Sequence, residues 1–132
     1  MEKYEEIQKE NEKIIKKFEA YLAKKGTSKK EIAKHLENTR LLINDYLASD
    51  WEVEPAQADS FHIQEFLDWC IDKWIFNTPT GLALALSSIR MFYSYLNENN
   101  NAKHANKILH ICENKDRYLK EFNDHERLLG EY

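Results

Sequence analysis

The chain has 132 residues, a length that suits one domain and leaves too little sequence for two ordinary ones. Three glycines and two prolines leave long stretches without helix breakers, and an apolar content of 42% excludes a disordered composition. The sequence has no apolar run of about 18 residues and no signal-type segment at its charged start. We therefore expect no membrane span and a cytoplasmic location.

Charge is distributed unevenly along the chain. The net charge of −4 argues against a strongly basic nucleic-acid binder, because neutralising phosphates requires clustered lysine and arginine. Residues 24–40, however, hold six basic and two acidic side chains, whereas residues 51–102 hold two basic and seven acidic ones. The basic character is therefore local, and it flanks the start of one predicted helix.

The first predicted helix covers about residues 2–25, where apolar side chains recur every three or four positions. Asn11 interrupts this stripe, and Gly26 suits a left-handed cap at the helix end. Two alternatives are open for the stripe: it packs on the domain itself, or it meets a partner helix in a short coiled coil. Its members are Tyr4, Ile7, Ile14, Ile15, Phe18, Tyr21 and Leu22.

A second helix is predicted to begin at Thr27 or Ser28 and to end near Ser49. Ser28 and Glu31 have the spacing of a capping box, in which each side chain satisfies a backbone donor of the other residue. The apolar stripe of this helix is Ile32, Leu36, Thr39, Ile43, Tyr46 and Leu47.

Residues 50–58 contain Pro55 and show no helical period, which predicts a loop. Asp59 or Ser60 then caps a third helix at about residues 61–75. The inner face of this helix is predicted to be Ile63, Phe66, Leu67, Cys70, Ile71 and Trp74.

Thr78 followed by Pro79 predicts the start of a fourth helix, because it combines a capping hydroxyl with proline at the first helical position. This helix runs to about Glu98. Its first half is small and apolar nearly all round, so we expect neighbouring helices on several sides. Its predicted buried face is Leu82, Leu86, Ile89, Phe92, Tyr93 and Leu96.

The last segment, residues 102–129, forms one helix or two, with a weak point near residues 113–115. Strand-like alternation of apolar and polar residues occurs nowhere in the chain. We therefore predict a single all-α domain over residues 1–132, built as a compact bundle of four to five helices.

Residues 86–96 read LSSIRMFYSYL, a run that resembles the helix ending the N-terminal core-binding domain of tyrosine recombinases and phage integrases. Upstream segments are similar to the same family at residues 18–22, 39–46 and 61–67. The similarity covers about residues 14–98, and it implies a SAM-like helical bundle of the recombinase core-binding type.

The resemblance also implies a function: one half of a clamp around duplex DNA, in the integration or recombination of a mobile element. Catalysis in that family belongs to a separate C-terminal domain outside the similarity, so we expect no enzymatic activity. The family's second and fourth helices approach the major groove, and lysines near a helix start suit phosphate contacts. The predicted DNA-contacting residues are Lys24, Lys25, Lys29, Lys30, Lys34, Arg40, Thr80, Ser87 and Arg90.

The basic residues in this set also have a plainer interpretation. The lysines suit a solvated turn between helices, and Arg90 suits an ion pair with Glu65 or Asp68. The leading alternative for the whole chain is a protein–protein module in which an acidic face, the first helix or the C-terminal helix meets a partner. A concave surface shared by the lysines and the fourth helix favours DNA, whereas one lined by acids of the third helix favours the alternative.

The remaining chemistry is sparse. No metal-ligand spacing joins the five histidines and two cysteines, so we expect no metal site, no cofactor and no catalytic residue. Cys70 and Cys112 fall on apolar stripes and are predicted to be core residues. Trp74 is also predicted to be in the core, while Trp51 or Trp69 is a candidate interface residue.

Overall fold

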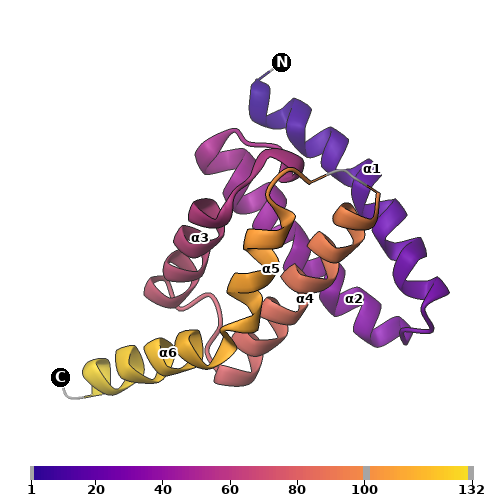
Figure 1. Cartoon of the computed structure of the whole chain (residues 1–132). Coiled ribbons are helices and arrows are strands. Elements are labelled where there is room, and N and C mark those ends of the chain that lie inside the picture. The colour runs from indigo at the N-terminus through magenta and orange to yellow at the C-terminus, as the bar shows by residue number, and fades with distance from the viewer. Residues whose placement is uncertain (1, 100–101, 131–132) are drawn as a thin grey trace.

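Helices form almost all of the regular structure in the computed structural model (Figure 1), which describes residues 2–99 and 102–130, with side chains up to Arg127. The six α-helices are α1 (Lys3–Lys24), α2 (Lys29–Arg40), α3 (Ser60–Asp72), α4 (Pro79–Glu98), α5 (Ala105–Glu113) and α6 (Lys115–Gly130). A π-helix, η1 (Leu41–Trp51), continues α2, and a 3₁₀ turn, η2 (Pro55–Gln57), follows it.

The all-α prediction is confirmed, and the count of four to five helices was wrong. The C-terminal segment is a helix pair that turns at Asn114, which follows α5 and precedes α6. Tyr118 and Phe122 of α6 are buried against the bundle, and the side chain of Leu129 lies outside the described residues. None of the described helices is long and apolar enough to cross a membrane.

The helix α4 lies in the middle of the bundle, where it contacts α1, α2, α5 and α6 (Figure 1). Its predicted start is confirmed, since Thr78 Oγ1 accepts a hydrogen bond from the Gly81 N–H at 3.0 Å. All six residues of its predicted inner face are buried. The Tyr93 hydroxyl donates to the Pro55 carbonyl at 2.9 Å, which anchors η2 on this central helix.

The apolar stripe of α1 packs on the domain itself. Ile7, Phe18 and Leu22 are buried, so the stripe is covered from the second turn of the helix to its end, while Tyr4 in the first turn is 38% exposed. Asn11 is also buried and donates hydrogen bonds to η1. Gly26 has a φ of +85°, which fits its predicted role at the end of this helix. Most apolar side chains of α1 are therefore used in packing within the domain, which argues against a coiled coil with a partner helix.

The second predicted helix consists of two different helices. Ser28 Oγ caps α2 by accepting from the Glu31 N–H at 3.2 Å, which is the serine half of the predicted capping box. The α-helix gives way to a π-helix at Leu41, and this π-helix ends at Trp51. The loop that was predicted to begin at residue 50 therefore begins later. A π-helix is a rare arrangement that is mostly seen as single turns inside α-helices. Side chains of α1 bond to this one, since Gln8 and Asn11 donate to the Asn44 and Ile43 carbonyls.

The helix α3 ends at Asp72, three residues before the predicted end. Its C-terminus is a Schellman motif: the Ile75 N–H donates to the Cys70 carbonyl at 3.0 Å, and the Trp74 N–H donates to the Ile71 carbonyl at 3.3 Å. Trp74 holds the left-handed position of the motif with a φ of +53°. It is therefore half-buried against α6 rather than part of the inner face of α3.

Candidate functional site

The basic residues predicted to contact DNA are exposed around the α1–α2 turn and along α2. Lys24, Lys25, Lys29 and Lys30 surround the turn, and all four are exposed. Lys30 and Lys34 are spaced four residues apart, with Asn38 four residues further on, so the three lie along one side of α2. Because Asn38 Nδ2 donates to Ser88 Oγ of α4 at 3.1 Å, this side of α2 is the one next to α4.

Arg40 is turned to the other side of α2. Its Nε and Nη2 atoms each lie 3.2 Å from a carboxylate oxygen of Glu12 in α1, which makes a bidentate ion pair. The Arg40 guanidinium is the main cause of the lowered pKa of Glu12. The structure therefore gives Arg40 a structural partner and separates it from the lysines beside α4.

A groove between α2 and α4 brings Lys34 together with the start of α4. We call it the α2–α4 groove; its volume is about 470 Å³. Two carboxylates, Glu37 and Asp45, line it as well, and Lys34 Nζ lies 3.4 Å from Glu37 Oε1 in an exposed ion pair. The complete lining is Lys34, Glu37, Asn38, Leu41, Asp45, Ile75, Phe76, Asn77, Thr78 and Gly81.

The residues predicted on α4 do not line this groove. Thr80 is exposed in the first turn of α4, and Ser87 is half-buried further along. Arg90 is exposed, and its positive charge partly opposes the burial that raises the pKa of the Cys112 thiol in α5. The predicted ion pair of Arg90 with Glu65 or Asp68 does not form among the described side chains.

A buried polar cluster beneath the α2–α4 groove joins the two helices. His35 Nδ1 lies 2.7 Å from Ser88 Oγ, and the Ser88 hydroxyl lies within hydrogen-bond distance (3.0 Å) of the Leu84 carbonyl. Burial lowers the pKa of His35. Sequence reasoning selected Ser87 and missed Ser88. A signal was present, because Ser88 lies three residues after the buried Ala85 and four before the buried Phe92.

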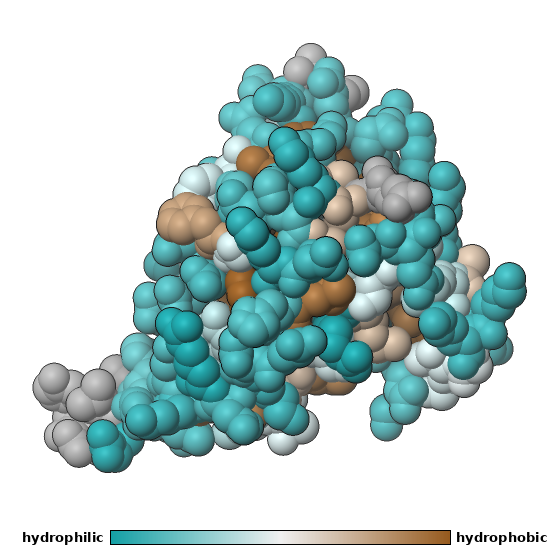
Figure 2. Space-filling view, viewed as in Figure 1, coloured by the Kyte–Doolittle hydropathy of each residue, from teal (hydrophilic) through white to brown (hydrophobic). Residues whose placement is uncertain are grey.

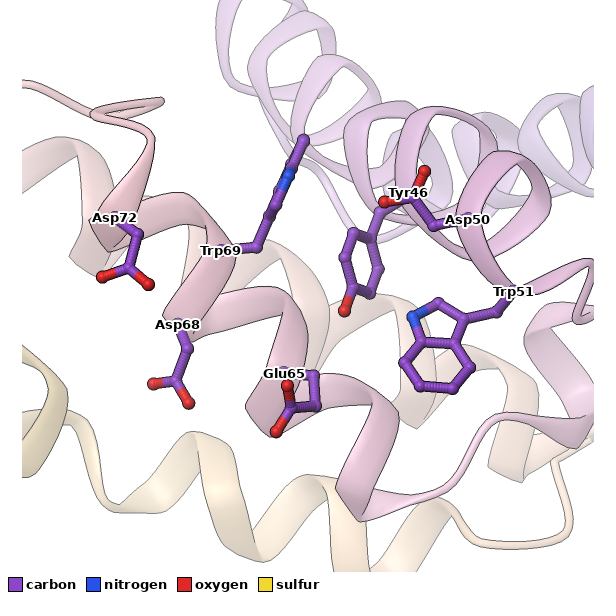
Figure 3. A pocket seen from close by; sticks show the side chains of 7 residues that line it. All are labelled: Tyr46, Asp50, Trp51, Glu65, Asp68, Trp69 and Asp72. Carbon is purple, nitrogen blue, oxygen red and sulfur yellow. The ribbon is translucent and has the colours of Figure 1, made fainter.

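A second groove lies between η1 and α3, and we call it the acidic groove (Figure 3). Its volume is about 390 Å³. Tyr46 and Trp69 pack side by side in it, with ring centroids 5.2 Å apart, and Trp51 stands at its end. The lining combines aromatic and acidic side chains: Tyr46, Asp50, Trp51, Glu65, Asp68, Trp69 and Asp72.

The acidic surface continues past α3. A neighbouring groove of about 350 Å³ shares Asp68 and Asp72 and adds Glu121 and Asp124 of α6. Burial raises the pKa of Asp68, and the negative charges of Glu121, Glu65 and Asp72 raise it further. Figure 2 shows that hydrophilic side chains cover most of the face presented there, with apolar ones showing between them.

The side chains with reactive or metal-binding chemistry are dispersed or buried. Cys70 and Cys112 are buried, and burial raises the pKa of each thiol, to about 12 for Cys112. Both are therefore core residues, with little thiolate at neutral pH. Within residues 2–99 and 102–127, no three His, Cys, Asp or Glu side chains come together as a metal-ligand set.

No family model, curated protein or solved structure matches this chain. The fold defines an all-α helical bundle with surface grooves, of which the α2–α4 groove includes a lysine and the acidic groove has only acidic charged residues. The resemblance to recombinase core-binding domains stays a prediction from residues 14–98.

Proposed function

We propose that the chain binds duplex DNA through the α2–α4 groove and the adjacent α1–α2 turn, as a non-catalytic module of the clamp type. One observation carries the proposal: Lys34 and the first turn of α4, at Thr78 and Gly81, line a single groove. The resemblance over residues 14–98 implies that the second and fourth helices approach the DNA, and it suggests a role in DNA integration or recombination.

The composition of α4 supports the approach of a polyanion. Although the chain is acidic overall, α4 carries no carboxylate between Pro79 and Asn97. Small or hydroxyl side chains at Thr80 and Ser87 allow a backbone to come close, and backbone N–H groups at the start of a helix suit phosphates. Lys30 and Lys34 flank this helix on the side of α2.

The carboxylates in the groove limit the expected affinity. Glu37 and Asp45 repel phosphates, so binding should be weak and should depend steeply on salt. If four lysines, Lys24, Lys29, Lys30 and Lys34, each neutralise one phosphate, the logarithm of the binding constant should fall with the logarithm of salt concentration with a slope of about −3 to −4. Arg40 is left out of this set because it is paired with Glu12, and Lys25 because its Nζ lies over the Tyr21 ring, 4.9 Å from the ring centroid.

Fluorescence anisotropy with a labelled duplex of about 20 base pairs, from about 50 to 200 mM salt, tests the proposal. We expect saturable binding that weakens steeply over this range. The double variant Lys30→Gln/Lys34→Gln should bind more weakly than the matched control Lys103→Gln/Lys107→Gln, which removes two exposed lysines at and near the start of α5. No detectable binding at about 50 mM salt, or equal effects of the two double variants, would overturn the proposal.

A further inference from the structure

The acidic groove concentrates carboxylates that the fold itself does not neutralise. Asp50 of η1 and Glu65, Asp68 and Asp72 of α3 line it. None of these four takes part in an ion pair with any side chain that the structure describes. Burial raises the pKa of Asp68, and the negative charges of Glu121, Glu65 and Asp72 raise it further, while Arg117 lowers it. A cationic ligand in the groove would relieve this repulsion.

Exposed aromatic side chains border the same groove, and they are an observation independent of its charge. Trp51 is 39% exposed and Phe61 is 51% exposed, with ring centroids 5.8 Å apart. Trp51 lines the groove itself, and Figure 3 shows its indole beside Tyr46, with Glu65 below them. Large aromatic side chains left in water with a polar rim mark interaction surfaces, where tryptophan and tyrosine often dominate the binding energy.

We propose that the acidic groove binds an arginine-containing segment of a partner protein. The guanidinium group stacks on the exposed indole of Trp51, beside the buried Tyr46, and donates hydrogen bonds to Asp50 and Glu65. Its planar fork suits both contacts at once, whereas the lysine ammonium is a more strongly hydrated point charge.

The shape of the surface favours a segment with more than one basic residue. Asp68 and Asp72 are one turn apart on α3 and lie between the acidic groove and the neighbouring groove with Glu121 and Asp124. A second basic side chain of the same segment therefore has carboxylates within reach along α3. This inference concerns a different surface from the α2–α4 groove and does not depend on DNA binding.

Two blocked pentapeptides test the proposal, Arg-Gly-Arg-Gly-Arg and Lys-Gly-Lys-Gly-Lys, each titrated into the full chain to about 2 mM to reach millimolar dissociation constants. Calorimetry measures affinity, and tryptophan fluorescence reports on Trp51 and Trp69 in the groove. We expect the arginine peptide to bind at least about threefold more tightly than the lysine peptide, since guanidinium stacks on aromatic rings.

Matched variants locate the binding. Asp68→Asn should weaken binding of the arginine peptide roughly two- to fivefold, the range expected for one partly exposed charge pair. Trp51→Ala should weaken it by about threefold through loss of stacking. Glu19→Gln, which removes an exposed charge from α1, should leave it unchanged. Circular dichroism and the chemical denaturation midpoint verify that each variant remains folded.

Several results would overturn the inference. Equal affinities for the two peptides would mean that the groove attracts any positive charge and does not recognise arginine. Equal effects of Asp68→Asn and Glu19→Gln would mean that the peptide binds at another surface. No saturable binding would remove the site. Sedimentation of the free chain that shows self-association, abolished by Asp68→Asn and also by Lys30→Gln/Lys34→Gln, would identify a second copy of this chain as the occupant instead.

Discussion

Asn11 of α1 donates a hydrogen bond from Nδ2 to the backbone carbonyl of Ile43 in η1, at 3.0 Å, with 1% of its surface exposed. The same Nδ2 lies 2.9 Å from Asn44 Oδ1, and Gln8 Nε2 donates to the Asn44 carbonyl at 3.3 Å. A polar residue that interrupts the apolar stripe of α1 thus bonds the helix to the π-helical segment beside it.

Asn11→Ala should destabilise the fold, because it leaves the Ile43 carbonyl buried without this donor. We expect the free energy of unfolding to fall by about 1–3 kcal/mol, measured by urea denaturation. Asn106→Ala, at an exposed position of α5, should change it by no more than about 0.5 kcal/mol. If the two variants were equally stable, water or a rearranged η1 would have to satisfy that carbonyl.

Tyr93→Phe tests how α4 holds the segment before α3. The phenol of Tyr93 is buried and donates to the Pro55 carbonyl at 2.9 Å, so the variant keeps the ring and loses one hydrogen bond. We expect a loss of about 1 kcal/mol in unfolding free energy and faster amide hydrogen exchange in residues 52–58. Tyr4→Phe, at an exposed ring, is the control and should have no measurable effect on either quantity.

The helix ends and the buried polar contacts show which parts of the fold the sequence could predict and which it could not. Thr78, Pro79 and the apolar spacing after them predicted α4 correctly, because caps and periodicity are local signals. The role of Asn11 was hidden, since its partners in η1 lie more than thirty positions away. The early end of α3 was also hidden. Trp74 takes the left-handed conformation there, a position that glycine usually occupies, so the residue type gave no signal of a helix end.

The candidate surfaces were predictable to a similar extent. The lysines of 24–34 were visible as a local excess of charge and are exposed as expected. Arg40 belonged to the same cluster in the sequence, yet its ion pair with Glu12 depends on how α1 and α2 pack. An acidic face, and Trp51 or Trp69 at an interface, were predicted as part of the alternative. The acidic groove itself was not, because Tyr46 and Asp50 meet Glu65 and Asp68 only once η1 packs beside α3.

His35 should make stability depend on pH. Burial lowers its pKa in the folded state below the ordinary histidine value, so the unfolded chain binds the proton more readily. The stabilising contribution is therefore complete above about pH 6.5 and is lost as the pH falls from there through the lower folded-state pKa.

Urea denaturation at about pH 7 and about pH 5 measures this dependence. The wild-type chain should lose more unfolding free energy between the two values than His35→Gln does, because glutamine does not titrate. An equal loss in both proteins would show that protonation of His35 costs the bundle nothing, and that other groups cause the dependence.

Arg40→Gln and Lys34→Gln remove the same charge from the same helix, and they should differ in their effects on DNA. Lys34 lines the α2–α4 groove, whereas Arg40 is held by Glu12. We expect anisotropy titrations at about 50 mM salt to show weaker binding for Lys34→Gln than for Arg40→Gln. Arg40→Gln should instead lower the unfolding free energy, by no more than about 1 kcal/mol for an exposed pair. The reverse order of DNA affinities would place the duplex on the α1 side of α2.

Removing the carboxylates of the α2–α4 groove should strengthen DNA binding. Glu37→Gln/Asp45→Asn takes away two negative charges beside the start of α4 and releases Lys34 from its ion pair with Glu37. We expect affinity for a duplex to rise by roughly two- to fivefold per carboxylate at low salt. The gain should shrink as salt rises, since added ions screen exposed charges.

The control for this variant is Glu19→Gln/Glu113→Gln, which makes the same change in net charge at exposed positions of α1 and α5. It separates the local effect from the general one, because any loss of negative charge weakens the repulsion between an acidic chain and a polyanion. A larger gain for the groove variant places the phosphates beside α4. If both variants gained equally, the duplex would respond to net charge alone, and the α2–α4 groove would not be its binding surface.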